Sequence, residues 1–193
     1  MSEPENTGLR TRLIDVGVDL VTAEGAQALT LREIARRAGV SHGAPRRYFP
    51  THLELLSAIA RRGFADLQER AAKATGGTGD GPRARLAVLA GVYLDFASSQ
   101  RGMYELMFRH DLLESSRLGL RETSMPLFGT LVELVGRVRP EADARIVAGA
   151  LWANLHGIAQ LWGWGSLKLA TDADDHAPLL KAALDAHLGP EER

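Results

Sequence analysis

The stretch TLREIARRAGVSHGAPRRYF, residues 30–49, decides how the N-terminal part of this chain folds. It opens with a capping box, in which Thr30 caps a helix and Glu33 reaches back to the cap. The helix that begins there, at 31–38, is only two turns long because a glycine follows it. Ser41 then offers a second cap. Two short helices joined by a tight turn are the plan of a helix-turn-helix.

The second short helix of this plan carries the basic side chains. At 3.6 residues per turn its positions 42, 43, 46 and 47 fall within an arc of roughly 140°, and they hold His42, Gly43, Arg46 and Arg47. Arginine can bind phosphate or form paired hydrogen bonds with guanine, and glycine allows a backbone to approach DNA closely. Proline is tolerated only in the first turn of a helix. Pro45 therefore predicts a cap shifted to His42 or Gly43, or a distorted first turn, in a helix of barely more than one turn.

The rest of the chain shows helical apolar spacing, and no sustained alternation predicts a strand. A helix at about 7–24 would pack across both short helices and complete a three-helix domain. Further helices are expected at 51–73, 83–99, 102–112, 116–138, 141–163 and 176–188. Pro126 could interrupt the fourth of these. The glycine-rich segment 74–82 is expected to be a linker and 163–175 a loop, so the fold class is all-α.

Charge is distributed unevenly along the sequence. The formal net charge is only −1, yet residues 30–62 hold seven arginines and two glutamates, a balance of +5 that leaves −6 for the remainder. A basic segment on an otherwise acidic protein is typical of a part that binds a polyanion. The charge pattern therefore favours nucleic acid as the partner of this segment.

Several classes of protein are disfavoured by what the sequence lacks. It has no cysteine, which excludes disulfides and thiolate metal sites. We expect a soluble, cytoplasmic protein, since we find neither a secretory signal nor a long apolar run. We find no catalytic motif, and GGTGDG at 76–81 lacks the Lys-Ser/Thr ending of a phosphate loop. His110 and Glu114 lie one helical turn apart without a third ligand, so no metal site and no cofactor are predicted.

The run LTLREIARRAGVSHGAPRRYFPTHLELLSAIA, residues 29–60, resembles the DNA-binding domain of the tetracycline-repressor (TetR) family of bacterial transcriptional regulators. The stretch at 151–165 is also similar to C-terminal domains of one subgroup, named for a Trp-His-Gly motif. The resemblance implies a homodimer of Ω-like shape, whose C-terminal domain holds a small ligand that releases DNA. By family position it also implies DNA contacts by Thr30, Ser41, Gly43, Arg46, Arg47, Tyr48 and His52. With His42 from the helical arc, these are the predicted DNA-binding residues.

The chain departs from the family pattern at two of these positions, Arg46 and His52, and at the neighbouring Pro45. Family members commonly have tyrosine where this chain has Arg46, and an apolar residue where it has Pro45. His52 occupies the place of a phosphate-binding lysine, and a histidine with a reference pKa of about 6.5 is mostly neutral at pH 7. We expect Arg46 to restore the missing charge and to shift the sequence preference toward guanine.

Aromatic and methionine side chains in the C-terminal part are candidates for a ligand pocket, although residues at helical spacing also form plain core. Trp152 and His156 lie at i and i+4 on one helix face. His156 is either a core histidine bonded to a backbone carbonyl or a polar anchor for a ligand. The predicted ligand-binding residues are Tyr93, Met103, Met107, Phe128, Trp152 and His156.

Small residues on the last two long helices predict the dimer interface, unless they pack within one chain. These residues are Gly149, Ala150, Ala153, Gly157, Ala182, Ala183 and Ala186.

The sequence as a whole predicts a helix-turn-helix DNA-binding domain at 1–52 and a larger helical ligand-binding and dimerisation domain at 53–193. The predicted function is a ligand-responsive DNA-binding regulator, a repressor that a small apolar ligand releases from an inverted-repeat operator. The alternative is an all-helical enzyme or small-molecule carrier whose basic N-terminal segment is incidental.

Overall fold

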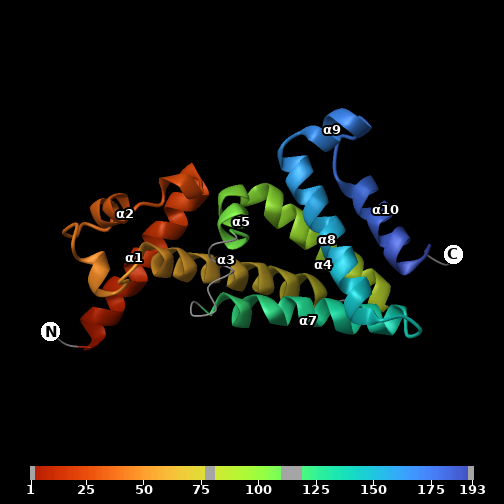
Figure 1. Ribbon diagram of the computed structural model, residues 1–193, viewed down its shortest axis with the longest axis horizontal. Helices are drawn as coiled ribbons and strands as arrows, with labels where there is room; N and C mark the ends of the chain where they lie inside the picture. The colour runs from red at the N-terminus through yellow and green to blue at the C-terminus, as the bar shows by residue number, and fades with distance from the viewer. Residues whose placement is uncertain (1–2, 77–80, 110–118, 191–193) are drawn as a thin grey trace. The chain divides into compact units, whose positions relative to one another are not determined.

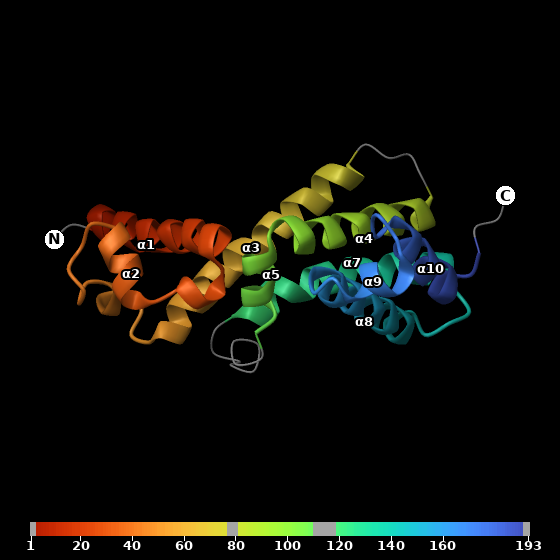
Figure 2. The same cartoon turned by 90° about the horizontal axis from the view of Figure 1, so that it is seen from above.

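The computed structural model describes residues 3–76, 81–109 and 119–190 (Figures 1 and 2). All regular structure in these ranges is helical, which confirms the predicted all-α class. The chain divides into two compact units by its internal contacts. The first combines residues 1–66 with 100–123, and the second combines 67–99 with 124–193. Each unit is described separately below.

The first unit contains the N-terminal helices and one segment from the middle of the chain. Its helices are α1 (Glu3–Glu24), η1 (Ala26–Ala28), α2 (Leu31–Arg37), η2 (Pro45–Arg47), the first part of α3 (His52–Thr75), α5 (Arg101–Met107) and the start of α7 (Leu120–Val138). Helix α1 contacts both α2 and α5. The core of the first unit is formed by side chains that are almost fully buried: Leu13, Leu20, Ile34, Phe49, Leu55, Ile59 and Tyr104.

The second unit is a bundle of longer helices. It contains the end of α3, most of α7, α4 (Pro82–Ser99), α8 (Ala144–Gly163), α9 (Ser166–Thr171) and α10 (Ala177–Leu188). Helix α8 packs against both α4 and α10. Asp143 caps α8, since its carboxylate accepts hydrogen bonds from the backbone N–H groups of Arg145 and Ile146.

Most predicted helices are present within a few residues of their expected ends. Pro126 lies inside α7 and does not divide it. Two elements were missed. The expected loop at 163–175 contains α9, which begins after Gly165 in the left-handed region, φ +78°. The short helix η1 follows Gly25, whose φ of +84° ends α1 as predicted.

The predicted domain boundary at residue 52 marks the end of the DNA-binding segment, whereas the two units above are defined by packing. The boundary at residue 52 therefore stays a prediction. His110 and Glu114 lie outside the described residues. No helix in the described part of the chain is long and apolar enough to cross a membrane.

Candidate nucleic-acid interface

The first helix of the helix-turn-helix is fixed at both ends by local hydrogen bonds. Thr30 Oγ1 accepts from the backbone N–H of Glu33 at 3.2 Å, which confirms the predicted cap. At the other end, Gly39 has φ +67°, and the N–H of Val40 donates to the carbonyl of Ala35 at 3.0 Å. This is the pattern of a glycine-ended helix. A second predicted cap is also confirmed at the start of α3, where Thr51 Oγ1 accepts from Glu54 N at 3.2 Å.

The second half of the predicted capping box is wrong. The Thr30 N–H donates to the carbonyl of Ala28 at 2.9 Å, so Glu33 does not reach back to it. The Glu33 carboxylate instead accepts from Arg36 Nε at 2.8 Å and from Arg37 Nε at 2.6 Å. The capping role of Glu33 is lost because the Thr30 N–H is already bonded to Ala28 O and both carboxylate oxygens of Glu33 are bonded to arginine.

The predicted recognition helix is a turn followed by the 3₁₀-helix η2. The N–H of Ala44 donates to Ser41 O at 2.9 Å, and the N–H groups of Tyr48 and Phe49 both donate to Pro45 O. Pro45 is the first residue of η2 and Ala44 precedes it as the cap. The predicted caps at His42 and Gly43 are therefore wrong, and the alternative of a distorted first turn is confirmed. The arc calculated at 3.6 residues per turn does not apply to this geometry.

Burial divides this segment into an inner and an outer side. Pro45 and Phe49 are buried, and Tyr48 is half-buried. Arg10 lies over the Phe49 ring, with its guanidinium carbon 5.2 Å from the ring centre. The predicted DNA-binding side chains on the outer side are all exposed: Ser41, His42, Gly43, Arg46 and Arg47. Pro45 and Phe49 thus anchor the segment while its polar side chains face solvent.

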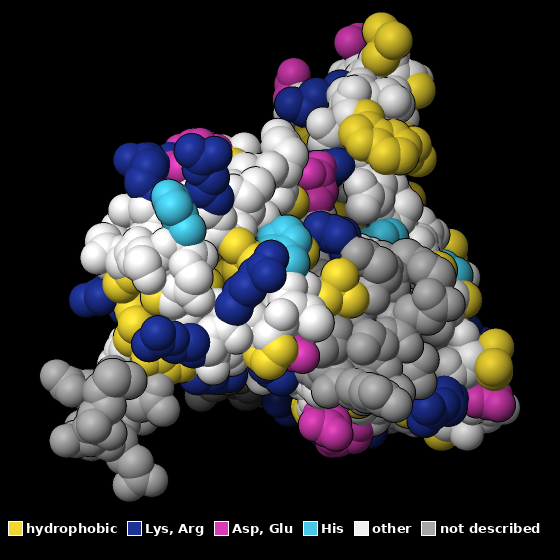
Figure 3. Space-filling model, turned by 60° about the vertical axis from the view of Figure 1, so that its left-hand side comes forward, with side chains coloured by type: hydrophobic (Ala, Val, Ile, Leu, Met, Phe, Trp, Pro, Cys, Tyr) yellow, Lys and Arg dark blue, Asp and Glu magenta, His cyan; other side chains and the backbone are white. Residues whose placement is uncertain are grey.

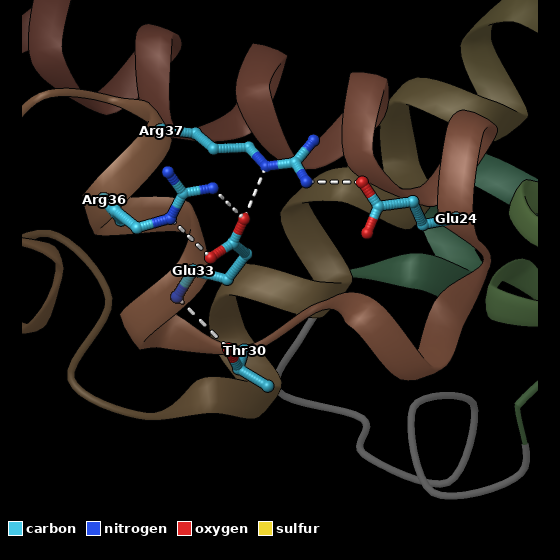
Figure 4. A network of polar contacts seen from close by, with 5 residues as sticks. All are labelled: Glu24, Thr30, Glu33, Arg36 and Arg37. Atoms are coloured by element: carbon cyan, nitrogen blue, oxygen red, sulfur yellow. Dashed lines mark hydrogen bonds and ion pairs between the residues drawn. The ribbon is translucent and has the colours of Figure 1, made fainter.

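An ion-pair network ties α2 to the end of α1 (Figure 4). Glu33 pairs with Arg36 and Arg37, and Arg37 also pairs with Glu24. Hydrogen bonds from the two arginines lower the pKa of Glu33 to about 2. The connection from Arg37 to Glu24 spans thirteen positions, so helical spacing could not reveal it.

This network changes which charges can attract DNA. Its two arginines and two glutamates sum to zero, so it adds little to the positive potential of the unit. Arg32, Arg46 and Arg47 are exposed and lie outside the network. Figure 3 shows Lys and Arg side chains spread over this N-terminal part of the surface. The basic balance found in the sequence therefore acts mainly through η2 and the start of α2.

The two remaining DNA-binding candidates lie at helix starts. Thr30 is exposed, and its hydroxyl hydrogen remains able to donate because the capping bond uses only the oxygen as acceptor. His52 Nε2 lies 2.7 Å from the Leu29 carbonyl oxygen. A carbonyl can only accept, so Nε2 carries the hydrogen and the ring is held toward the protein backbone.

Four of the predicted ligand-binding residues form a connected cluster in the second unit. The Tyr93 hydroxyl lies 2.9 Å from His156 Nδ1. The Trp152 ring packs 6.0 Å from the His156 ring and 6.3 Å from the Phe128 ring, measured between ring centres. Burial lowers the pKa of His156, so the ring is neutral at pH 7. The Tyr93 hydroxyl is thus a partner of this histidine, and sequence spacing could not show this contact.

The other two predicted ligand-binding residues, Met103 and Met107, belong to the first unit. Both are buried on α5 around Gly63 of α3. A β-carbon at position 63 would lie 2.6 Å from Met107 Sδ and 2.7 Å from Met103 Cγ. The absence of a side chain at Gly63 is what lets the two methionines pack there.

Comparison with known proteins agrees with this geometry. Residues 13–59 match the model described as bacterial regulatory proteins, tetR family, and residues 86–186 match a tetracyclin repressor-like C-terminal domain. The chain belongs to the tetR family of bacterial regulatory proteins. The second match does not name the Trp-His-Gly subgroup, so membership of that subgroup stays a prediction.

Relatives within the tetR family include two proteins named HTH-type transcriptional regulator BetI. The protein from Serratia proteamaculans is 32% identical over 77% of this chain and 78% of its own length. That from Stenotrophomonas maltophilia is 30% identical over 82% of this chain and 81% of its own. The chain is accordingly a DNA-binding transcriptional regulator, which confirms that part of the predicted function.

Solved structures show the same fold. A protein of unknown function from Rhodococcus sp. RHA1 has a TM-score of 0.79 and 30% identity, and the match covers 93% of each chain. A TetR-like transcriptional regulator from the same organism has a TM-score of 0.68 and 20% identity, covering 95% of this chain and 97% of its own. The second likeness supports the fold alone.

Proposed function

We propose that this tetR-family regulator is a homodimeric repressor that binds an inverted-repeat operator through Arg46 and Arg47. The observation that carries the proposal is the exposed pair of arginines on η2, held outward by the buried Pro45 and Phe49. Arginine forms two parallel hydrogen bonds with guanine O6 and N7. In a dimer the two recognition segments would enter successive major grooves, with half-sites about 34–36 Å apart or a multiple of that.

The neighbouring residues support binding to the DNA backbone. Thr30 and Tyr48 carry hydroxyl groups that can donate to phosphate, and Ser41 and His42 are exposed in the turn before η2. Gly43 allows close backbone approach. His52 is assigned a supporting part, because its bond to Leu29 O directs Nε2 away from an external phosphate.

The effector is proposed to be a small, largely apolar molecule bound in the second unit near Tyr93, Phe128, Trp152 and His156. The hydroxyl–imidazole pair of Tyr93 and His156 offers one polar contact among aromatic rings, which is the usual composition of a ligand site. The effector would lower DNA affinity by its differential binding to the DNA-bound and released states. Helix α3 is the proposed link, since it begins in the first unit and ends in the second.

The protein would act in the cytoplasm, where bacterial DNA is accessible, and by binding rather than by catalysis. The test is fluorescence anisotropy of a labelled duplex from the region upstream of its own coding sequence. Arg46→Ala and Arg47→Ala should each weaken specific binding by about 1–3 kcal/mol. Arg36→Ala is the matched control, because it deletes an equal charge that is already paired with Glu33.

The control should lose less affinity than either recognition variant and should keep its sequence preference. Tight, specific binding that survives loss of both Arg46 and Arg47 would overturn the assignment of η2. No duplex binding at any salt concentration would overturn the repressor, and would favour the carrier or enzyme alternative.

A further inference from the structure

A basic hollow lies between α1 and α3 in the first unit. Its volume is about 280 Å³, close to the lower end of the range usual for small-molecule sites, about 300–1,000 Å³. Its described lining residues are Arg10, Thr11, Ile14, Asp15, Ala58, Arg61 and Arg62. The three arginines and one aspartate among them give a formal charge of +2. None of these residues belongs to the predicted DNA-binding set or to the predicted ligand-binding set.

The hollow lies beside a tight crossing of α1 and α3 (Figure 1). A β-carbon at Gly17 would lie 2.3 Å from Ile59 Cδ1, so the absence of a side chain there allows α3 to approach α1. The lining residues of α1 come from the two turns before Gly17, and those of α3 lie next to Ile59 at spacings of three and four. Ile14 and Ala58 are buried, so they give the hollow an apolar floor.

Two exposed arginines, one from each helix, line the hollow. Arg62 Nη2 donates to Asp15 Oδ1 at 2.9 Å, a bond that joins α3 to α1. The guanidinium carbon of Arg10 lies 5.2 Å from the Phe49 ring centre. An arginine has five N–H donors, so a single bond to a carboxylate or a contact with a ring leaves donors for a ligand. Arg61 is engaged in other contacts, so Arg10 and Arg62 are the donors considered for a ligand.

We propose that this hollow binds a small phosphate monoester, with Arg10 and Arg62 on the phosphate and the uncharged body of the ester over Ile14 and Ala58. Two guanidinium groups from separate helices can each bind different oxygens of one phosphate, whereas a carboxylate offers only two oxygens. A phosphate monoester carries about −1.5 to −2 charge at pH 7, which suits a basic lining. The site is separate from the aromatic cluster proposed for the effector, so it adds to the proposed function.

The position of Arg62 favours a free molecule over the phosphate backbone of DNA. Arg62 lies ten residues after His52, the first residue of α3, which places it about 15 Å along the helix from the end that follows η2. A duplex seated on the recognition segment η2 would lie at that end. Arg10, by contrast, stacks on the Phe49 ring that anchors η2. A molecule that engages Arg10 would therefore act on this anchor and change DNA affinity without touching the duplex.

Calorimetric titration with phenyl phosphate, in phosphate-free buffer and without DNA, tests the site. We expect saturable binding of one molecule per chain, weaker binding of benzoate and no binding of phenol. Arg10→Gln and Arg62→Gln should each weaken binding of phenyl phosphate by roughly tenfold or more, because each removes hydrogen bonds to a charged group. Arg32→Gln is the matched control, since Arg32 is an exposed arginine of the same unit that does not line the hollow. The control should bind like the unmodified protein.

Asp15→Asn distinguishes a binding site from an ion pair that serves only the fold. The substitution removes the negative charge of the described lining and releases Arg62 from its carboxylate partner. The side chains of Asp15 and Arg62 are 48% and 59% exposed, so the variant should fold. We expect it to bind phenyl phosphate roughly two- to fivefold more tightly. Weaker binding by this variant would show that Arg62 serves the fold and would overturn the site.

The link to η2 is tested by anisotropy of the labelled upstream duplex at constant ionic strength. Saturating phenyl phosphate should change the Kd of the duplex, and the duplex should change the Kd of phenyl phosphate by the same factor. Arg10→Gln should lose this coupling. An unchanged duplex Kd would overturn the action of the hollow on η2.

No step of the calorimetric titration needs DNA, so failure of the site and failure of the proposed repressor are distinguishable. No saturable binding of phenyl phosphate, or binding that is unchanged in both Arg10→Gln and Arg62→Gln, would overturn the site. Benzoate that binds as tightly as phenyl phosphate would overturn the choice of phosphate. If phenyl phosphate does not bind, yet both variants weaken duplex binding as much as Arg46→Ala does, the hollow receives the DNA backbone and the free molecule is overturned.

Discussion

Replacing Gly102 with alanine would drive a methyl group into the backbone at the end of α1. A β-carbon at position 102 would lie 2.3 Å from the Val21 carbonyl oxygen and 3.0 Å from Gly25 Cα. Ordinary contact begins at 3.4 Å, so α5 and α1 would have to separate by about 1.1 Å at the closer contact. The Val21 oxygen also accepts the hydrogen bond from Gly25 N at 3.0 Å that ends α1. The obstacle is therefore backbone, which cannot move aside as a flexible side chain can.

The expected cost follows from overpacking. Inserting a methyl group into a packed contact typically costs about 1–3 kcal/mol, and alanine regains up to about 1 kcal/mol of helix propensity. We expect a net loss of roughly 1–2 kcal/mol, which is a substantial part of a stability of about 5–15 kcal/mol. The readouts are the midpoints of thermal and urea unfolding by circular dichroism. Operator affinity should also fall, because the strained segment leads directly into α2.

Gly129→Ala is the matched control for this substitution. It lies within α7, and an added β-carbon there meets no heavy atom within 4 Å. It should raise stability by roughly 0.5–1 kcal/mol through helix propensity alone. If Gly102→Ala unfolds at or above the midpoint of the unmodified protein, the close approach of α5 to α1 is refuted.

Three further predictions concern the two sites. The pKa of Glu33 is lowered to about 2, so the stability from its ion pairs is present above pH 4.5 and is lost as the pH falls toward 2. The Glu33→Gln variant should have a lower Tm at pH 7. Its Tm, measured by scanning calorimetry, should also fall less steeply with acid than that of the unmodified protein. Burial lowers the pKa of His156, so the folded protein disfavours protonation of this ring and its stability falls as the pH drops below 6.5. In the His156→Gln variant, Tm measured between pH 7 and 5 should lack this loss of stability. Pro45→Ala should cost about 0.4–1 kcal/mol by freeing the unfolded chain, and should change operator affinity; an unchanged anisotropy titration would show that the proline is tolerated rather than used.

Local signals predicted the helix ends well. Thr30 and Thr51 cap the helices that follow them, and Gly25 and Gly39 adopt the positive φ expected after a helix. These features depend on residues within four positions of one another, so sequence spacing determines them. The helical class follows from the same short-range periodicity.

The missed features depend on contacts between distant residues. The sequence left open how Pro45 shapes the start of this helix, and it did not show that residues 45–47 form a 3₁₀-helix with Pro45 buried. The pairing of Tyr93 with His156 joins positions 63 apart, and neither residue indicates the other. Such long-range packing overrides local conformational preference. The residue types of both sites could therefore be predicted from the sequence, but the geometry in which they are held could not.

The ion pairs that sequence spacing could not show also change the salt dependence expected for DNA binding. If all seven arginines of residues 30–62 contacted phosphate, the slope of log affinity against log salt would be about −6 per subunit. Arg36 and Arg37 pair with glutamates, and Arg62 pairs with Asp15 at 2.9 Å. At most four arginines of this segment then contribute, which gives about −3.6 per subunit and about −7 for a dimer. A slope well beyond −7 would show that DNA draws these arginines from their carboxylate partners.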